Sequence, residues 1–265
     1  MISKTGIRFA IALGLLAWCP TPRAHAGYVA GFSVSSITVP PPGTGAVDSH
    51  NFDNTTPATM LTPTTVTSTT TAAGAQANGL STASLGALKT YGYTYQPTTG
   101  SSFTYSQTHE EINTLDTITV VGKMGQALGT PVQLKFTLDL HGSFVDKYFP
   151  FENYESVTTA NYLGSSSGGG SVSLYYQTGP AKPANSFQTT ILQTAVGDTV
   201  TIQAGLDSVT YVGGDSANSL AIQDYSSTMH YYIDAITPGI QVVSAAGYDY
   251  STSVPEPSSI ILLSA

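Results

Sequence analysis

The sequence predicts an all-β protein, an antiparallel β-sandwich for which a jelly roll is one arrangement. Three observations predict this fold class. Apolar and polar residues alternate with period two in several stretches, which is the pattern of strands buried on one face. No stretch of the sequence carries the apolar stripe of an amphipathic helix. Glycine, asparagine and aspartate interrupt the chain at intervals of roughly 8–20 residues, which favours consecutive antiparallel strands over helical crossovers.

The first 26 residues have the layout of a secretory signal peptide. A basic start, an apolar centre and a small-residue cleavage pattern follow one another at Lys4 and Arg8, at residues 9–18, and at Ala24-His25-Ala26. This order predicts cleavage before Gly27. The apolar centre is about half of the ~20 residues that a membrane span needs, so removal is favoured over anchoring. We therefore expect an exported chain, from which Cys19, the single cysteine, has been removed.

The composition of the chain beyond this peptide excludes several classes of partner. It contains five lysines and no arginine against all 16 acidic residues, which gives a net charge near −11. Nucleic acids and anionic membrane surfaces are disfavoured, because both are bound by clustered basic residues. Without cysteine there is no disulfide framework, so stability depends on a packed core. Charged residues are only 9% of the whole chain, which implies a surface of hydroxyl, amide and tyrosine side chains.

Three stretches give the clearest strand patterns. Apolar residues occupy every second position of 132–140, and the same alternation runs through 199–204. The third stretch contains Tyr91, Tyr93 and Tyr95, which share one face of a strand. Further strands are expected near 28–39, 101–107, 115–122, 171–177, 186–193, 207–212, 219–224, 228–236 and 240–244. A hairpin turn is expected at Gly213-Gly214-Asp215.

Two segments depart from the strand pattern. Residues 40–78 are rich in proline, threonine, alanine and glycine, a composition typical of linkers and stalks. Within them, the threonine run at 64–71 can be either a linker or an edge strand, and the sequence leaves both open. Residues 164–171 are mainly serine and glycine, and we expect a flexible loop there.

Two short motifs resemble catalytic ones but are incomplete. Gly164-Ser165-Ser166-Ser167-Gly168 matches G-x-S-x-G, yet a nucleophilic Ser166 would need a following helix and a histidine base, whereas another strand pattern follows. His109-Glu110-Glu111-Ile112-Asn113 begins like H-E-x-x-H, but Asn113 stands where the second zinc ligand belongs. We therefore expect no enzyme of either class.

Carboxylates and aromatic residues gather between positions 139 and 155. The carboxylates are Asp139, Asp146, Glu152 and Glu155, and the segment 144–154 adds several rings. Tyr148, Phe151, Glu152 and Tyr154 are candidates for binding a glycan, by ring stacking and hydrogen bonds to hydroxyls. A loop that only covers one end of the sandwich is the other interpretation. No cofactor is expected; Ca²⁺ on these carboxylates is a weaker hypothesis because no D-x-D-x-D-G pattern is present.

The end of the chain carries a short sorting motif. Val254, Pro255, Glu256 and Pro257 precede two serines and four apolar residues, and together they resemble the start of a PEP-CTERM tag, also catalogued as an "ice-binding protein C-terminal domain". The resemblance implies recognition by an exosortase, with 254–265 as the tag and 27–253 as the β-sandwich ectodomain. In that family a transmembrane helix follows the tag. Membrane attachment would therefore need a C-terminal helix that is missing from this chain.

These observations predict an exported, non-enzymatic protein of the cell surface or extracellular matrix. We expect a structural or adhesive role alongside exopolysaccharide. A carbohydrate-binding module is the alternative. A secreted glycoside hydrolase ranks third, because it would need a carboxylate pair such as Asp146 and Glu152 to meet in a cleft.

Overall fold

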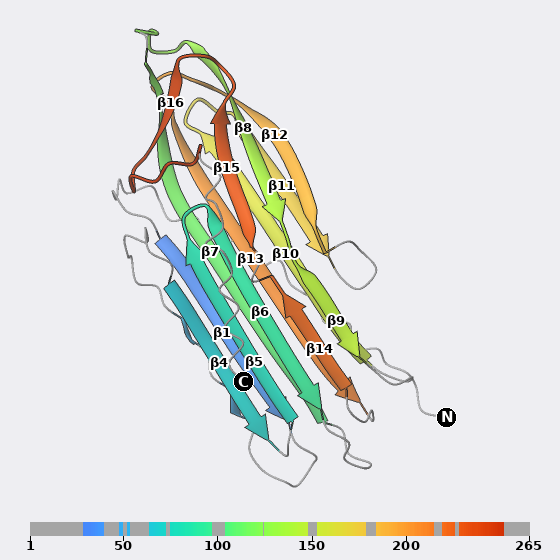
Figure 1. Cartoon of the computed structure of the whole chain (residues 1–265). Coiled ribbons are helices and arrows are strands. Elements are labelled where there is room, and N and C mark those ends of the chain that lie inside the picture. The colour runs from blue at the N-terminus through green and yellow to red at the C-terminus, as the bar shows by residue number, and fades with distance from the viewer. Residues whose placement is uncertain are drawn as a thin grey trace, which may run out of the picture.

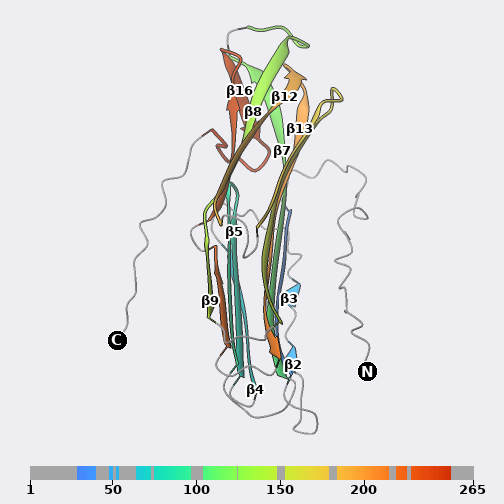
Figure 2. The same ribbon diagram turned by 90° about the vertical axis from the view of Figure 1, so that its right-hand side faces the viewer.

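The fold consists of two antiparallel β-sheets packed face to face. The computed structural model describes residues 29–39, 48–49, 52–53, 64–72, 75–96, 104–123, 125–147, 153–178, 184–214, 219–225 and 228–251. All regular structure in these ranges is β, in two sheets of eight strands each. Figure 2 shows the two layers edge-on, running side by side along the long axis. The predicted β-sandwich is confirmed.

Sheet A has the order β11-β10-β13-β7-β1-β2, with β3 beside β1 and β16 beside β7. Its strands are β1 (Val29–Val39), β2 (Asp48–Ser49), β3 (Phe52–Asp53), β7 (Thr104–Gly122), β10 (Asn153–Ser166), β11 (Ser171–Thr178), β13 (Thr199–Gly214) and β16 (Ile240–Ser244). The long strands β7 and β13 pair with each other and form the centre of the sheet.

Sheet B contains the other eight strands, with β12 at one edge and β4 at the other. They are β4 (Thr64–Ala72), β5 (Ala75–Ser84), β6 (Ala87–Gln96), β8 (Pro131–Leu140), β9 (Ser143–Lys147), β12 (Ser186–Ala195), β14 (Ser219–Asp224) and β15 (Met229–Ala235). The consecutive strands β8 and β9 follow one another along one row of this sheet, and β14 and β15 share the neighbouring row. β8 accordingly pairs with β15, and β9 pairs with β14. Figure 1 shows this sheet in front, with β4, β5, β6, β14 and β9 in the lower part.

Several sequence predictions need correction at the level of individual strands. Residues 104–107 of the expected strand 101–107, and all of the expected strand 115–122, belong to one 19-residue strand, β7, while 101–103 lie outside the described residues. Likewise, 199–204 and 207–212 are both contained in β13. Strands β5 and β10 were not predicted at all. The alternation was missed because many inward positions in these strands hold serine, threonine, alanine or glycine instead of large apolar residues.

The described parts of the segments predicted to be irregular lie in strands or in a tight turn. Residues 64–72 form β4 and pair with β5 along its length. Of the two alternatives for the threonine run, linker or edge strand, the structure has the edge strand. The serine- and glycine-rich segment contains the end of β10, a tight turn and the first residue of β11. The Ser166 amide donates to the Gly170 carbonyl over 2.8 Å and closes that turn.

The expected hairpin at Gly213-Gly214-Asp215 is wrong. β13, which ends at Gly214, lies in sheet A, and the next strand, β14, lies in sheet B. This part of the chain therefore crosses between the sheets. The chain also changes sheet after β3, β6, β7, β9, β11, β12 and β15.

The space between the sheets is divided into an apolar end and a hydroxyl-rich end. At the apolar end, Tyr162 packs between Phe136 and Tyr231, with ring centroids 5.1 Å from each. At the other end, between β5, β6 and β14 on one side and β7, β10 and β13 on the other, many buried side chains are polar. They are Ser81, Thr90, Thr94, Ser106, Thr108, Glu110, Thr158, Ser208, Thr210 and Gln223.

Candidate functional site

The most distinctive surface of the described chain is the outer side of sheet B around β6. Residues of this strand alternate between the two sides of the sheet. Leu88, Thr90, Gly92 and Thr94 are buried between the sheets, whereas Tyr91, Tyr93 and Tyr95 point outward and are partly exposed. The predicted tyrosine row is therefore on a solvent-facing surface.

The residues directly opposite these tyrosines complete the surface. Cross-strand partners point to the same side of a sheet. On β5 the partners are Gln76, Asn78 and Leu80, and on β14 they are Leu220, Ile222 and Asp224. We call these six residues together with Tyr91, Tyr93 and Tyr95 the tyrosine face. Val145 on β9, opposite Ile222 and 40% exposed, extends it by one strand.

The tyrosine face has the dimensions and chemistry of a platform for an extended ligand. Alternate residues of an antiparallel strand are about 6.8 Å apart, so the three rings form a straight row of about 14 Å. A tyrosine ring offers an apolar surface and a hydroxyl that can donate and accept hydrogen bonds. Asn78, Gln76 and Asp224 place amide and carboxylate groups beside the row. This combination can stack against apolar faces of a ligand and bind its hydroxyl groups.

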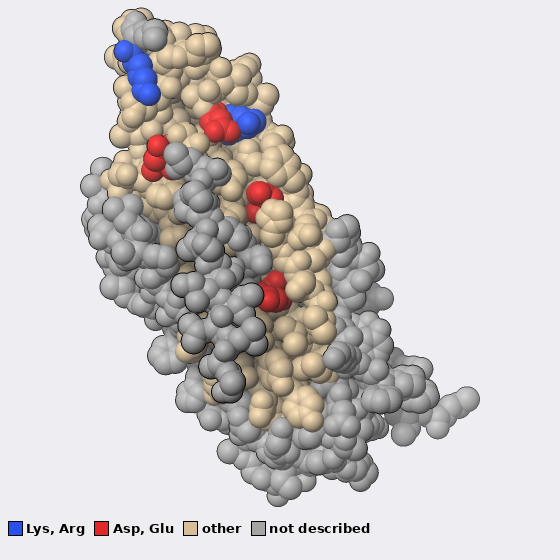
Figure 3. Space-filling model, viewed as in Figure 1, with Lys and Arg blue, Asp and Glu red and all other residues tan. Residues whose placement is uncertain are grey.

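The phenol groups of Tyr91 and Tyr93 stay neutral at physiological pH. Burial raises the pKa of Tyr91, and the negative charge of Asp224 raises it further. Burial also raises the pKa of Tyr93, with a smaller contribution from Tyr95. Figure 3 shows this side of the molecule, where charged side chains among the described residues are few and include the ion pair of Lys135 with Asp234. A neutral ligand fits such a surface better than a charged one.

The glycan-binding residues that the sequence suggested are only partly placed. Tyr148, Phe151 and Glu152 lie outside the described residues. Tyr154 is in β10, where its backbone pairs with Val212 of sheet A. The segment 144–154 is therefore not one loop: it begins in β9 of sheet B and ends in β10 of sheet A.

The four candidate carboxylates do not form a described cluster. Asp139 pairs with the neighbouring His141, with Oδ1 and Nε2 2.9 Å apart. Asp146 is in β9 of sheet B and Glu155 is in β10 of sheet A, while Glu152 lies outside the described residues. Among the described residues, no group of three or more His, Cys, Asp or Glu side chains could hold a metal ion.

The G-x-S-x-G sequence forms part of a turn in which Ser166 has a clear structural environment. Its hydroxyl donates to Asp198 Oδ2 over 3.0 Å and lies 2.8 Å from the Thr194 hydroxyl. Asp198 Oδ2 also accepts the Ala195 amide over 3.0 Å. These bonds tie the β10–β11 turn to the connection between β12 and β13. Neither the helix nor the histidine that a nucleophile elbow needs is present among the described neighbours.

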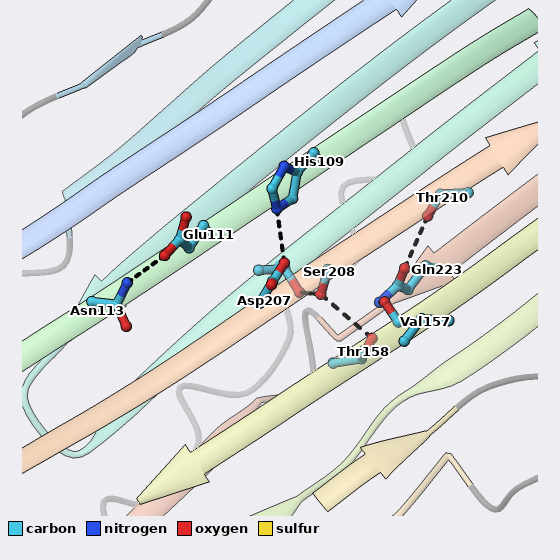
Figure 4. A network of polar contacts seen from close by, with 10 residues as sticks. His109, Glu111, Asn113, Val157, Thr158, Asp207, Ser208, Thr210 and Gln223 are labelled. Carbon is cyan, nitrogen blue, oxygen red and sulfur yellow. Dashed lines mark hydrogen bonds and ion pairs between the residues drawn. The ribbon is translucent and has the colours of Figure 1, made fainter. Parts of the chain in front are cut away.

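The segment that begins like a zinc motif is also part of a strand. In β7 the side chains of His109, Glu111 and Asn113 point outward, and Glu110 points into the core. His109 Nε2 lies 2.9 Å from Asp207 Oδ1, and Asn113 donates to Glu111 over 2.7 Å (Figure 4). The hydrogen bond to Asp207 raises the pKa of His109 more than burial lowers it. These contacts make His109 part of an ion pair on the outer side of sheet A.

A separate pocket of about 270 Å³ lies at the apolar end of the sandwich. Its polar side chains are those of Lys123, Gln241, Ser244, Tyr248, Asp249 and Ser251, and apolar residues of β15 and β16 line most of the remainder. It contains none of the residues that the sequence singled out. Its single lysine and single aspartate provide no recognisable acid–base pair.

The two predicted processing sites lie outside the described residues. This holds for Ala24, Ala26 and Gly27 at the start and for Val254, Pro255, Glu256 and Pro257 near the end. Within the described part of the chain, there is no helix long and apolar enough to cross a membrane.

The sequence placed Tyr91, Tyr93 and Tyr95 on one face of a strand but did not show which face is exposed. Large rings at 91, 93 and 95 alternate with Thr90, Gly92 and Thr94, and the polar threonines would be the outward set of a usual strand, so the pattern alone did not indicate that the rings face solvent. The structure adds the partners from β5 and β14. Comparison of the chain with protein-family models, with curated proteins and with solved structures found no match.

Proposed function

We propose that this protein is an exported component of the cell surface or extracellular matrix that holds neutral exopolysaccharide on its tyrosine face. The observation that carries the proposal is the straight row of Tyr91, Tyr93 and Tyr95 on the outer side of sheet B. The role is structural or adhesive, without catalysis.

The chemistry of the tyrosine face supports a polysaccharide as ligand. Sugar rings present apolar C–H faces that stack on aromatic rings, and hydroxyl groups around their edges. Asn78, Gln76 and Asp224 flank the row with both donors and acceptors for such hydroxyls. A straight row also suits an extended chain better than a compact ligand, because successive units can occupy successive rings.

Charge supports a neutral polymer over an anionic one. The chain carries a formal net charge of −8, and the partner nearest to Tyr91 across β14 is the carboxylate Asp224. An acidic polysaccharide would be repelled by both. Nucleic acid is disfavoured for the same reason.

Export and sorting complete the proposal from the sequence. The predicted signal peptide at 1–26 supports secretion, and the resemblance of 254–259 to a PEP-CTERM tag supports exosortase as a partner. Replacing Glu256 by alanine is expected to abolish processing at the tag in the native host, as measured by the size of the mature protein. Unchanged processing would remove exosortase from the proposal and leave the tyrosine face untouched.

A retention assay tests the binding function. The full-length chain is mixed with insoluble cellulose, with chitin, with the host's own exopolysaccharide and with alginate beads as an anionic polymer. Binding to at least one neutral polymer, and weaker binding to alginate, is expected. A variant with Tyr91→Thr, Tyr93→Thr and Tyr95→Thr removes the rings while keeping residues that favour strands. It is expected to lose retention by at least about tenfold, since a stacked aromatic ring contributes about 1 kcal/mol or more.

The matched control is Tyr175→Thr. Tyr175 is 57% exposed and lies on β11 of sheet A, away from the tyrosine face. It is expected to bind like the unchanged protein. If the control loses binding as strongly as the triple variant, or if the unchanged protein is retained by none of the neutral polymers, the proposed function is wrong. A purely structural role would then be the better description.

A further inference from the structure

A threonine and a glutamine from opposite sheets meet inside the hydroxyl-rich end of the core. The Thr210 hydroxyl on β13 donates to Gln223 Oε1 on β14 over 2.9 Å, as Figure 4 shows. Both side chains are fully buried. The Gln223 amide nitrogen points the other way and lies 3.5 Å from the Val157 carbonyl. These contacts hold a hydroxyl oxygen against the oxygen of a carboxamide, in a place that bulk water does not reach.

A glycine lets an acidic group approach the same point. Gly92 is the direct cross-strand partner of Gln223. A Cβ atom on Gly92 would stand 2.7 Å from Thr210 Oγ1, 2.6 Å from Thr108 Oγ1 and 3.3 Å from Glu110 Oε2. The three oxygens therefore converge on the space that the missing side chain leaves, next to Gln223.

The carboxyl group of Glu110 is not used in any hydrogen bond between described residues. The residue is fully buried, and neither carboxyl oxygen makes a hydrogen bond of good geometry with a described residue. Burial raises the pKa of Glu110 well above its ordinary value, and the nearby Thr108 hydroxyl lowers it only in part. A neutral carboxylic acid in this position can accept a proton on one oxygen and donate a proton from the other.

We propose that Thr210 and Gln223 form an intramolecular ester, with Glu110 transferring the protons. The Thr210 oxygen attacks Cδ of Gln223, so that an Oγ1–Cδ bond forms and the Cδ–Nε2 bond breaks. The hydroxyl proton passes to one oxygen of Glu110. After the Gln223 carboxamide turns its nitrogen away from Val157 and toward Glu110, the acid proton of Glu110 passes from its other oxygen to the leaving nitrogen. Ammonia leaves, and Glu110 ends protonated as it began. No oxidant, metal or cofactor takes part.

The cross-link would fasten the two sheets together at the end of the sandwich where apolar packing is weakest. β13 belongs to sheet A and β14 to sheet B, and their interior neighbours are mainly serine and threonine. The predicted mature chain has no cysteine with which to make a disulfide. Burial of the pair protects the ester from hydrolysis.

Mass spectrometry of the full-length chain tests the proposal. The measured mass is expected to be lower than the sequence mass by one ammonia, about 17 Da. Cleavage before aspartate would normally release 207–214 and 215–223 as separate peptides, because Asp207, Asp215 and Asp224 bound them. With the ester they are expected as one joined species, and hydroxylamine should separate them.

Three variants complete the experiment. Thr210→Val and Glu110→Gln are expected to have their full sequence masses, and Thr90→Val is the matched control. Thr90 is another buried threonine of this region, whose hydroxyl contacts Ser208 at 2.7 Å, and its variant should keep the cross-link. A full sequence mass for the unchanged protein overturns the proposal. Loss of ammonia that maps elsewhere, such as to Asn78-Gly79, overturns it too.

Discussion

Tyr250 donates its phenol hydrogen to Asp116 Oδ2 over 2.9 Å, and both side chains are buried at the apolar end of the sandwich. The same oxygen accepts the Ser244 hydroxyl over 2.6 Å. Tyr250, near the end of the described chain, thus supplies a hydrogen bond to the buried carboxyl group of Asp116 in β7. The Tyr250 carbonyl also accepts the Ile233 amide at 3.1 Å, which fastens this segment to β15.

Replacing Tyr250 by phenylalanine is therefore expected to destabilise the protein while keeping most of the packing. The change leaves a buried carboxyl oxygen with one partner fewer, at a cost of about 1–3 kcal/mol. Urea unfolding followed by circular dichroism measures this loss. Tyr248→Phe is the matched control, since Tyr248 packs against Tyr250 at 4.8 Å and no described bond of its hydroxyl would be lost. Equal losses in the two variants would contradict the assigned role of the Asp116 bond.

Glu110 is expected to make the protein less stable as the pH rises. The pKa of its carboxyl is raised in the folded state by burial, and it is about 4.3 in an unfolded chain. Below pH 4 both states are protonated and the group has no effect. Above that, the folded state is penalised by up to about 1.4 kcal/mol per pH unit until the folded pKa is passed.

The Glu110→Gln variant tests this pH dependence. Its free energy of unfolding should fall less steeply between pH 5 and pH 8 than that of the unchanged protein. Only the slopes are compared, because the variant also lacks the group that the proposed ester needs. Glu111→Gln, on the outer side of the same strand, controls for the loss of one negative charge. Identical slopes for the unchanged protein and Glu110→Gln would contradict the prediction.

Asp198 is expected to act in the opposite direction and at lower pH. The hydrogen bonds from Thr194 and then from Ser166 lower the pKa of its carboxyl. The resulting stability is present above the unfolded pKa of about 3.9 and is lost as the pH falls through the folded value. Because the group is near the surface, solvent screening limits the effect to less than about 1 kcal/mol. Thermal unfolding of Asp198→Asn should match the unchanged protein at pH 2 and fall below it at pH 6.

Gly92→Ala is expected to destabilise the sandwich by about 1–3 kcal/mol, the usual cost of overpacking a core. The new methyl group would stand 2.6 Å from Thr108 Oγ1 and 2.7 Å from Thr210 Oγ1. Chemical denaturation measures the loss. Adding Thr108→Ala should recover part of it, because one of the two contacts disappears. No recovery in the double variant would show that the clash with Thr108 does not set the cost.

Single replacements in the tyrosine row should separate ring stacking from hydrogen bonding. Tyr93 is the central ring, between Asn78 and Ile222. Tyr93→Ala should weaken retention on the neutral polymer that the protein binds, whereas Tyr93→Phe should keep most of it if stacking dominates. The measurement is a binding isotherm on that polymer. If both variants bind the polymer equally weakly, the Tyr93 hydroxyl rather than its ring contributes the binding energy.

The sequence by itself determined the fold class and much of the strand pattern. Apolar alternation in 132–140 predicted β8 correctly, and the inward residues of that strand are buried as expected. The row of Tyr91, Tyr93 and Tyr95 on one face of a strand was also readable, because alternation depends only on local geometry. The signal peptide and the sorting tag stay predictions from the sequence.

The tertiary structure alone decided which residues oppose one another. β5 and β10 were hidden because their inward positions are small or hydroxylated, and the interior of this end is polar. The partners of the tyrosine row come from β5 and β14, and the contact of Thr210 with Gln223 joins opposite sheets. Such pairings follow from how strands are ordered and stacked. No local pattern encodes them, since residues of the same type would alternate in the same way in any sheet order.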